Sequence, residues 1–311
     1  MLKIEKYSNK FAEAWNTFIK KSKNGIFMFD RNYMDYHKDR FEDHSLMFFD
    51  DDELVAVLPA SIKDHVLKSH GGLTYGGLIM GFDLKQEKNL EIFELLKAYL
   101  KDNGISSLIY KQIPHIYHKY PAEEDLYGLF RIGAKIFKTE PSTTIDLSCP
   151  IKFTKGRKAQ IARAKKNNVI ITESNDFDAF IDLENFVLGK YHNQTAVHTG
   201  KELSLLKSNF DDNIKLYVAL KDGELIAGGV FFIYDNCVHS QYLAANDFAR
   251  KIGGLDLVIS TVIDKYKDTK KYLDFGISTE DNGQVLNTGL ISQKTSFGGR
   301  TIAYNTFIIE P

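Results

Sequence analysis

A short segment of the chain combines two cations with two adjacent glycines ahead of an apolar helical repeat. Arg250 and Lys251 supply the cations. Gly253 and Gly254 follow, and Leu255 begins a run with apolar residues at helical spacing. Glycines leave backbone N–H groups unobstructed, and a helix N-terminus carries partial positive charge. We therefore predict that this loop binds a phosphate; a turn that simply needs glycine is the alternative.

Two charged residues lie further along the chain, near the ends of expected elements. Asp274 lies in the strand-like segment 272–276, and Lys294 precedes an expected closing strand over 301–309. A cation at such a place can stabilise the oxyanion of a tetrahedral acyl-transfer intermediate or a negatively charged donor. We predict Lys294 and Asp274 as catalytic residues. The alternatives are a solvated lysine and an aspartate that caps or braces a loop.

Aromatic and imidazole side chains accompany glycines in the first half. Tyr33 and His37 are one helical turn apart, and Tyr75 lies between two glycine pairs in the segment 69–77. The glycine spacing is not that of a dinucleotide-binding fingerprint. Ordinary packing is the alternative to ligand contact for these side chains. The predicted substrate-binding residues are Tyr33, His37, Tyr75, His198, Tyr242 and Ser278.

Composition limits the possible partners. The 311 residues include 40 Lys and Arg against 41 Asp and Glu, so the formal net charge of −1 provides no global field for nucleic acid or an acidic membrane. One basic run, over 152–166, is either a solvated helix face or a phosphate contact. Its members are Lys152, Lys155, Arg157, Lys158, Arg163, Lys165 and Lys166.

Other motifs with a known chemistry are missing from the sequence. There is no G-x-S-x-G, P-loop or H-E-x-x-H pattern. Cys149 and Cys237 lack metal-ligand spacing, and His192 and His198 are six residues apart, so we predict no metal site. We read no export signal and no run of 18 apolar residues, and we expect a cytoplasmic protein.

The same order of elements occurs twice along the chain. In each half an amphipathic helix precedes a strand-turn-strand segment, at 46–62 and at 216–233, and a second helix and a strand follow. The two following strands begin at Ser107 and Tyr272, an offset of 165 residues. We predict an α/β protein with mixed sheets, built as two domains related by an internal repeat. Because Pro150 interrupts pairing, we place the domains at 1–150 and 151–311.

This order resembles the Gcn5-related N-acetyltransferase (GNAT) fold, and two such domains in tandem resemble the Fem-type transferases. The resemblance covers nearly the whole chain and is carried by 239–266, 272–279 and 286–300. It implies that Arg250 and Gly253 hold the pyrophosphate of coenzyme A, although Leu255 replaces the last small residue of that pattern. Lys294 stands where Fem-type proteins carry Phe-Lys, with Gln293 replacing the aromatic residue. His37 stands where they bind substrate phosphate with a lysine.

The resemblance implies an acyltransferase that moves an acyl group from acyl-CoA to an amine of a sugar, an amino acid or a cell-envelope precursor. Such a reaction needs alignment and proton removal, not a triad. Two alternatives stay open. One is a Fem-type transferase that uses aminoacyl-tRNA in peptidoglycan synthesis, and the other is a non-catalytic binding module of the same fold.

Overall fold

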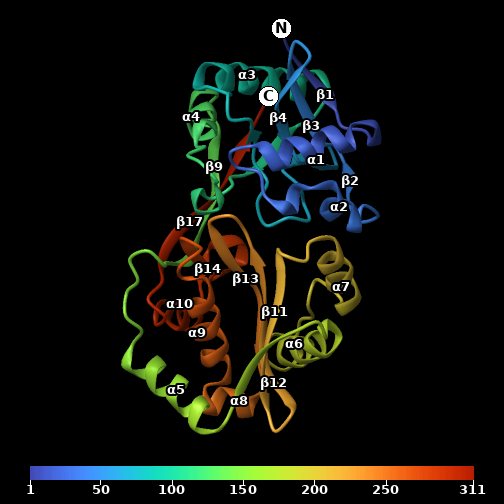
Figure 1. Ribbon diagram of the computed structural model, residues 1–311. Coiled ribbons are helices and arrows are strands. Elements are labelled where there is room, and N and C mark those ends of the chain that lie inside the picture. Colours follow the sequence, from blue (N-terminus) through green and yellow to red (C-terminus); the bar gives the residue numbers. More distant parts are fainter. The chain divides into compact units, whose positions relative to one another are not determined.

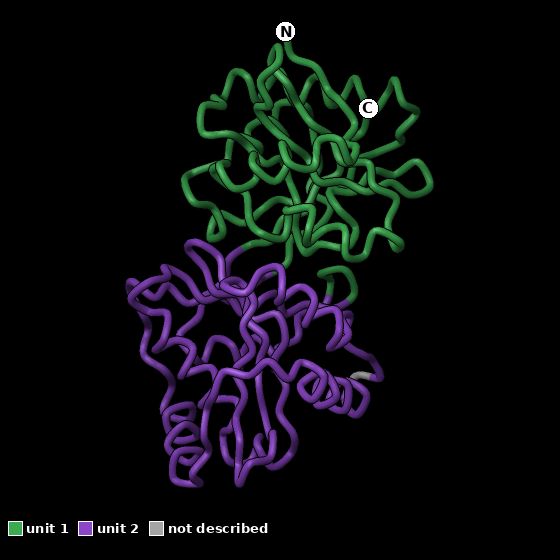
Figure 2. The backbone as a smooth tube through the Cα atoms, turned by 45° about the vertical axis from the view of Figure 1, so that its right-hand side comes forward, with its two compact units in different colours: residues 1–140, 281–284, 303–311 green, residues 141–280, 285–302 purple. Residues whose placement is uncertain are grey.

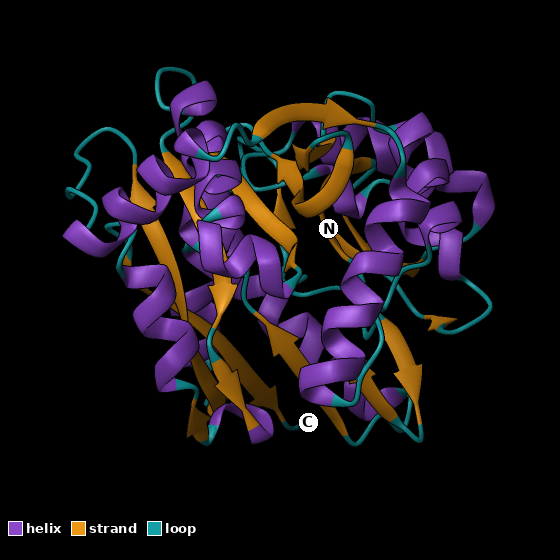
Figure 3. Cartoon of the chain, turned by 90° about the horizontal axis from the view of Figure 1, so that it is seen from below, coloured by secondary structure: helices purple, strands orange, loops and turns teal.

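The computed structural model describes the whole chain apart from the side chain of His192. The chain forms two compact units (Figures 1 and 2). Unit 1 comprises residues 1–140, 281–284 and 303–311, and unit 2 comprises residues 141–280 and 285–302. Both units combine helices with strands. Figure 3 shows the helices in purple and the strands in orange, and this composition confirms the predicted α/β class with mixed sheets.

Unit 1 holds a four-stranded sheet in the order β1-β3-β4-β7. A second group of strands follows the order β8-β6-β5-β2, and the end of β17 pairs with β8. The elements are β1 (Leu2–Lys6), α1 (Ala12–Lys21), α2 (Arg31–Met34), β2 (Glu42–Asp43), β3 (Leu46–Asp50), β4 (Glu53–Leu58), β5 (Ser61–Lys63), β6 (Val66–Lys68), β7 (Ile79–Met80), α3 (Gln86–Asp102), β8 (Ser107–Lys111), α4 (Glu124–Arg131), β9 (Lys135–Asp146) and β17 (Arg300–Ile309).

Unit 2 holds a sheet in the order β10-β11-β12-β13-β14-β9, to which β9 contributes its second half. A short hairpin, β15 (Thr279–Glu280) and β16 (Val285–Leu286), follows the sheet. The other elements are α5 (Lys155–Lys166), β10 (Ile170–Ser174), α6 (Phe177–His192), α7 (Gly200–Asn209), β11 (Ile214–Lys221), β12 (Glu224–Ile233), β13 (Cys237–Ala245), α8 (Asp247–Ile252), α9 (Gly254–Tyr266), β14 (Tyr272–Ile277) and α10 (Thr288–Thr295).

Helices cover both faces of the unit 2 sheet. Helix α9 packs on β11, β12 and β13 from one side, whereas α6 and α7 pack on the other side (Figure 1). The apolar stripe of α9 supplies Val258, Ile259 and Val262 to a core that also contains Phe231 and Leu273. These side chains are almost fully removed from water, and their burial is the main stabilising contribution to the unit.

The sheet of unit 2 opens between β13 and β14. These parallel strands pair only from Cys237 with Tyr272 to His239 with Asp274, and beyond that point no pairing continues. An irregularity in the pairing of β12 with β13 falls between Val230 and Phe231, and such bulges redirect a strand. The second half of β13, which pairs with β12 but not with β14, and the end of β14 therefore border an opening, which α10 and α6 line.

The predicted repeat is confirmed. The order β1, α1, β3, β4, α3, β8 in the first half recurs as β10, α6, β11, β12, α9, β14 in the second. Both strand-turn-strand segments are antiparallel hairpins. The turn of the second is Asp222-Gly223, in which both residues have positive φ, as a type I′ turn requires.

The compact units differ from the predicted division at residue 150. Strand β9 is continuous from Lys135 to Asp146, and its residues from Ser142 onward pair with β14 of unit 2. In return, Thr306 to Ile309 of β17 pair with β8 of unit 1. Each half of the sequence thus gives its last strand to the sheet of the other unit. Pro150 lies in the irregular segment after β9.

Candidate active site

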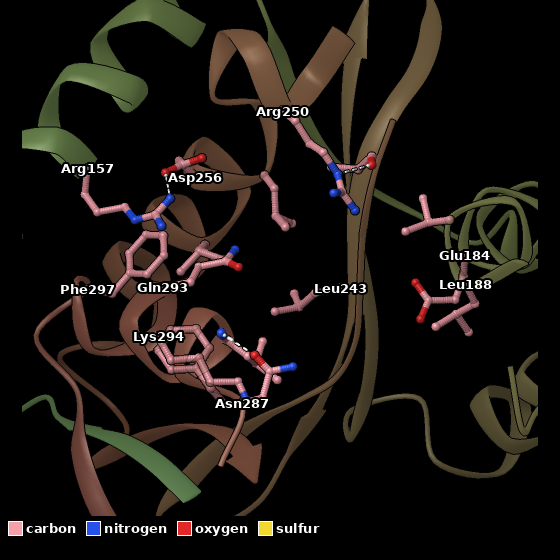
Figure 4. A pocket seen from close by; sticks show the side chains of 16 residues that line it. Arg157, Glu184, Leu188, Leu243, Arg250, Asp256, Asn287, Gln293, Lys294 and Phe297 are labelled. Atoms are coloured by element: carbon pink, nitrogen blue, oxygen red, sulfur yellow. Dashed lines mark hydrogen bonds and ion pairs between the residues drawn. The ribbon is translucent and has the colours of Figure 1, made fainter. Parts of the chain in front are cut away.

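A cavity of about 480 Å³ lies where β13 and β14 separate in unit 2 (Figure 4). It is within the size range of small-molecule sites, and its wall combines nine apolar residues with seven polar or charged ones. The lining residues are Arg157, Glu184, Val187, Leu188, Leu243, Ala245, Arg250, Leu255, Asp256, Ile259, Phe275, Asn287, Leu290, Gln293, Lys294 and Phe297.

Lys294 lies on α10 and is 7% exposed. Its Nζ donates hydrogen bonds to the carbonyl oxygens of Gly276 (2.9 Å) and Ile277 (2.6 Å) at the end of β14. An ammonium group has three donors, so one remains for a ligand in the cavity. Burial lowers the pKa of Lys294 to about 8, and the charge of Asp274 opposes this shift. The structure thus places the predicted cation in the cavity wall.

Asp274 is fully buried beneath the opening and is not among the residues that line the cavity. One carboxylate oxygen accepts from Ser142 and Thr144, both at 2.6 Å. The other oxygen accepts from His239 Nδ1 and from the backbone N–H of Gly276, both at 2.9 Å. Burial alone would raise its pKa, but the hydrogen bonds lower it to about 2. Asp274, which we predicted to be catalytic, therefore links β14 to β9 and β13 through hydrogen bonds. It also fixes the backbone of Gly276, whose carbonyl oxygen accepts a hydrogen bond from Lys294.

Two arginines supply further positive charge. Arg157 at the start of α5 forms an ion pair with Asp256, donates to Ser296 Oγ at 2.6 Å and lies over the Phe297 ring. Arg250 on α8 donates to the Ala245 carbonyl at 3.1 Å. In Figure 4 these two side chains approach the cavity from different helices. Guanidinium groups bind phosphates and carboxylates well, so this part of the wall suits an anionic group.

Glu184 is the polar group on the α6 side of the cavity. Its residue is 6% exposed, and its Oε2 has no hydrogen-bond partner among the described residues. Burial raises the pKa of Glu184 to about 7. An acid on the apolar side of a helix is unusual, because it must lose hydration. The sequence contains a signal for Glu184, which continues the apolar stripe of Phe177, Phe180 and Ile181, but Glu184 was not among the predicted site residues.

The glycines of the predicted phosphate loop are explained by helix packing. Gly253 has a φ of +81° between α8 and α9, and a Cβ there would lie 2.4 Å from the Gln160 carbonyl oxygen of α5. A Cβ on Gly254 would lie 3.1 Å from that of Ala249. Both glycines, and the exposed Lys251, are outside the cavity lining. Of the four predicted cofactor-binding residues, the structure brings only Arg250 to the cavity.

The position of Asp256 also concerns the predicted phosphate loop at the start of α9. It occupies the first turn of α9, and its carboxylate pairs with Arg157. A carboxylate at a helix N-terminus occupies the positive region that a phosphate would use. Asp256 and Asn287 carry no distinguishing motif, because they line a cavity that forms only where β13 and β14 separate.

Three further predicted residues belong to unit 2 but not to the cavity lining. Tyr242 on β13 and His198 form a pair, with the tyrosine oxygen 2.6 Å from His198 Nδ1. Burial raises the pKa of Tyr242, and the nearby charge of Glu184 raises it further. Ser278 is fully buried beside the opening, where its backbone N–H donates to Pro141.

The remaining predicted residues, Tyr33, His37 and Tyr75, belong to unit 1. All three are buried. Tyr33 packs edge-on against Tyr36, His37 contacts the ring of His70, and Tyr75 contacts those of Tyr117 and Tyr304. Their contact with substrate stays a prediction.

Some ligand classes find no site in the described part of the chain. Among the described residues, no group of three or more His, Cys, Asp and Glu side chains is placed to hold a metal ion. The side chain of His192, half of the histidine pair weighed in the sequence, lies outside the described residues. No described helix has both the length and the apolar character needed to cross a membrane.

No family model matches the sequence, and a search of curated proteins finds no match. Solved structures do match. FemX is 11% identical with a TM-score of 0.70, over 99% of this chain and 97% of that one. L-PGS from Bacillus licheniformis is 14% identical with a TM-score of 0.64, over 97% and 90%. A tandem GNAT protein from the clavulanic acid biosynthesis pathway is 8% identical with a TM-score of 0.53, over 100% and 98%.

These likenesses define the class of fold. The chain has the tandem GNAT-like fold that FemX, L-PGS and the tandem GNAT protein share, as the resemblance in the sequence predicted. At such low identity the comparisons show the fold and leave the chemistry to the residues of the site.

Proposed function

We propose that the protein transfers an acyl group from an activated donor to an amine, in the cavity of unit 2. The observation that carries this proposal is a buried lysine with one remaining N–H donor in the wall of a cavity formed by separating strands. A fixed cation in a site of low polarity stabilises negative charge that develops during a reaction, and it needs little reorganisation to do so. The acceptor we propose is an amine of a sugar, an amino acid or a cell-envelope precursor.

The residues that line the cavity would have separate roles in such a reaction. Lys294 would donate its remaining N–H to the oxyanion that forms when the amine attacks the acyl carbonyl carbon. Arg250 and Arg157 would hold an anionic part of donor or acceptor. The apolar wall, which includes Leu243 and Phe275, would exclude water and favour aminolysis over hydrolysis.

We propose acyl-CoA as the donor, held through its phosphates by Arg250. The packed Gly253 and Gly254 and the carboxylate of Asp256 give this donor no backbone cradle at α9. That observation favours a second candidate, an aminoacyl-tRNA donor. The exposed lysines of α5, including Lys155, Lys158 and Lys165, would then contact RNA phosphates.

A transfer assay with both donor classes tests the proposal. The purified chain is incubated with acetyl-CoA or with a pool of aminoacylated tRNA, together with a set of primary amines, and amide products are measured by mass spectrometry. Product with acetyl-CoA supports the first donor. Product with the tRNA pool, at an affinity that falls steeply with salt, supports the second. No amide product with either donor contradicts acyl transfer.

A binding assay separates an enzyme from a binding module. If coenzyme A binds the folded chain, unfolding free energy should rise by about 2.7 kcal/mol at 100 times the dissociation constant. Arg250→Ala should weaken that binding about tenfold, the effect of losing roughly one charge-assisted hydrogen bond. Lys251→Ala, beside it but exposed, is the matched control and should change binding less. Binding without product in every transfer assay would indicate a module.

A further inference from the structure

Glu184 combines three properties that the packing of unit 2 does not require. It lines the cavity, it is 94% removed from solvent, and its Oε2 has no hydrogen-bond partner in the described part of the chain. A buried carboxyl oxygen without a partner is costly unless a ligand provides one. No ion pair or side-chain hydrogen bond joins the Glu184 carboxyl to another described residue, so this carboxyl does not brace the fold as that of Asp274 does.

Few titratable groups lie on the elements that pack against α6. Tyr242 of β13 is close enough for the charge of Glu184 to affect its pKa, and His198 holds the hydroxyl of that tyrosine. Strand β12, which also packs on α6, has no titratable residue after Glu224, and the charged residues of α7 are Lys201, Glu202 and Lys207. The charged residues in the rest of the cavity wall are Arg157, Arg250, Asp256 and Lys294.

The two polar ends of the cavity are arranged for acyl transfer. Figure 4 shows Glu184 on α6 and Lys294 on α10 on opposite sides of the hollow, with Leu243 between them. An acyl carbonyl whose oxygen points at Lys294 would present its carbon toward the α6 side. An amine that attacks that carbon would lie on the same side as the Glu184 carboxylate.

We propose that Glu184 is the general base that takes the proton of the acceptor amine; the inference rests on the proposed acyl transfer. The amine nitrogen forms a bond to the acyl carbonyl carbon, and one Glu184 oxygen accepts the proton that the nitrogen loses. The bond from the acyl carbon to the sulfur or oxygen of the donor then breaks. The leaving thiolate or alkoxide takes a proton from Glu184, which restores the carboxylate.

The pH dependence of the reaction reports on this role. Burial raises the pKa of Glu184 to about 7, so kcat should rise with pH as the base loses its proton. Burial lowers the pKa of Lys294 to about 8, so kcat should fall as the cation is lost. The structure predicts a narrow bell-shaped profile with its maximum between these two pKa values.

Three variants test the proposal. Glu184→Gln keeps the shape of the side chain but cannot take a proton; it should lower kcat at least 100-fold, with KM nearly unchanged, and should lose the acidic limb of the profile. Glu184→Asp should retain a basic group and recover part of kcat. Asp182→Asn removes an exposed carboxylate two residues away on the same helix and should behave as wild type. A Glu184→Gln variant with wild-type kcat and an unchanged acidic limb would overturn the proposal.

A second measurement does not depend on turnover. Infrared difference spectra of the intact chain should show more carboxyl absorption titrating near pH 7 in wild type and Asp182→Asn than in Glu184→Gln, in which the Asp125 contribution remains. A Glu184 that loses its proton below pH 5 would overturn the role of a base near neutral pH. If this absorption titrates as expected but wild type transfers no acyl group from either donor, the proposed function fails, and with it the catalytic role. If wild type is active and the Gln variant is equally active, the inference alone fails.

Discussion

Tyr110 of unit 1 and Phe275 of unit 2 occupy corresponding positions, at the 165-residue offset that separates the starts of β8 and β14. The Tyr110 ring is fully buried, and its hydroxyl donates to Asp125 of α4 and accepts from the N–H of Leu78, both at 2.7 Å. Phe275 has no hydroxyl and faces the cavity. At this position unit 1 has a buried tyrosine whose hydroxyl is hydrogen-bonded, whereas unit 2 has a phenylalanine in the wall of its cavity.

The same offset pairs Leu129 on α4 with Lys294 on α10. Leu129 belongs to the apolar core of unit 1, whereas Lys294 bonds two carbonyl groups and retains one donor. The comparison teaches that core packing closes the position beside β8 in unit 1, whereas unit 2 has a cavity beside β14. The Tyr110 hydroxyl has both a donor and an acceptor partner, although Oδ1 of Asp125 has none among the described residues, whereas Lys294 retains a donor in the cavity wall.

The largest effect should come from replacing the cation of unit 2. Lys294→Met removes the proposed oxyanion donor, so kcat and kcat/KM should fall together by about 100-fold or more. Lys294→Arg should restore little, because a planar guanidinium places its charge differently. Leu129→Met at the corresponding place of unit 1 is the matched control and should leave both constants unchanged. A rise in KM alone would make Lys294 a substrate anchor, and no change at all would break the comparison.

Unit 2 also contains a glycine, Gly253, at which the backbones of two helices approach closely. Gly253→Ala would place a Cβ against the Gln160 carbonyl at a positive φ, and we expect a loss of roughly 2 kcal/mol of unfolding free energy from strain and crowding. Gly156→Ala on α5, where a Cβ meets nothing within 4 Å, should stabilise by about 0.5 kcal/mol. Urea denaturation measures both. A Gly253→Ala variant of normal stability with weakened donor binding would restore the phosphate-loop interpretation.

In unit 1, removing one hydroxyl should cost stability but not chemistry. Tyr110→Phe leaves the Leu78 N–H and the Asp125 carboxyl without that partner in a buried place, and we expect a loss of about 1–2 kcal/mol. The transfer rate per folded molecule should not change. Loss of kcat at normal stability would show that unit 1 takes part in the reaction at this position, contrary to the contrast drawn between the units.

The smallest effect concerns pH. Burial raises the pKa of Asp125 to about 7, although the Tyr110 hydrogen bond opposes the shift. The neutral carboxyl therefore stabilises the fold fully below about pH 4, and this contribution is lost as pH rises through about 7. Asp125→Asn stays neutral, so its Tm relative to wild type should increase by a few degrees from pH 4 to pH 8. Calorimetry at several pH values checks this; a constant difference would mean that Asp125 is ionised throughout.

Much of the fold was predictable from the sequence. Amphipathic helices and the turn at Asp222-Gly223 are local patterns, so the order of elements and the repeat followed from them. The pairing of β9 with β14 and of β17 with β8 was not predictable, because the local sequence around Ser142 and Thr306 does not indicate which sheet each strand joins. Pairing between distant strands is decided by packing rather than by local preference.

Only part of the cavity wall was predictable from the sequence. Lys294 and Arg250 line it, and a resemblance pointed to their segments. Gly253 does not line it, because the sequence shows that a glycine permits close approach but not that α5 is what approaches. Glu184 and Asp256 were missed because each is a single carboxylate in a helix, and only the separation of β13 from β14 gives them a cavity to face.

A crystal structure of the chain with its donor tests the central claim most directly. The donor that gives product in the transfer assay, made unreactive at its acyl carbon, is bound at saturation. We predict density for the acyl group in the unit 2 cavity, with its carbonyl oxygen within hydrogen-bond distance of Lys294 Nζ and its carbon facing Glu184. An acyl group bound elsewhere, with Lys294 still bonded only to Gly276 and Ile277, would contradict the account.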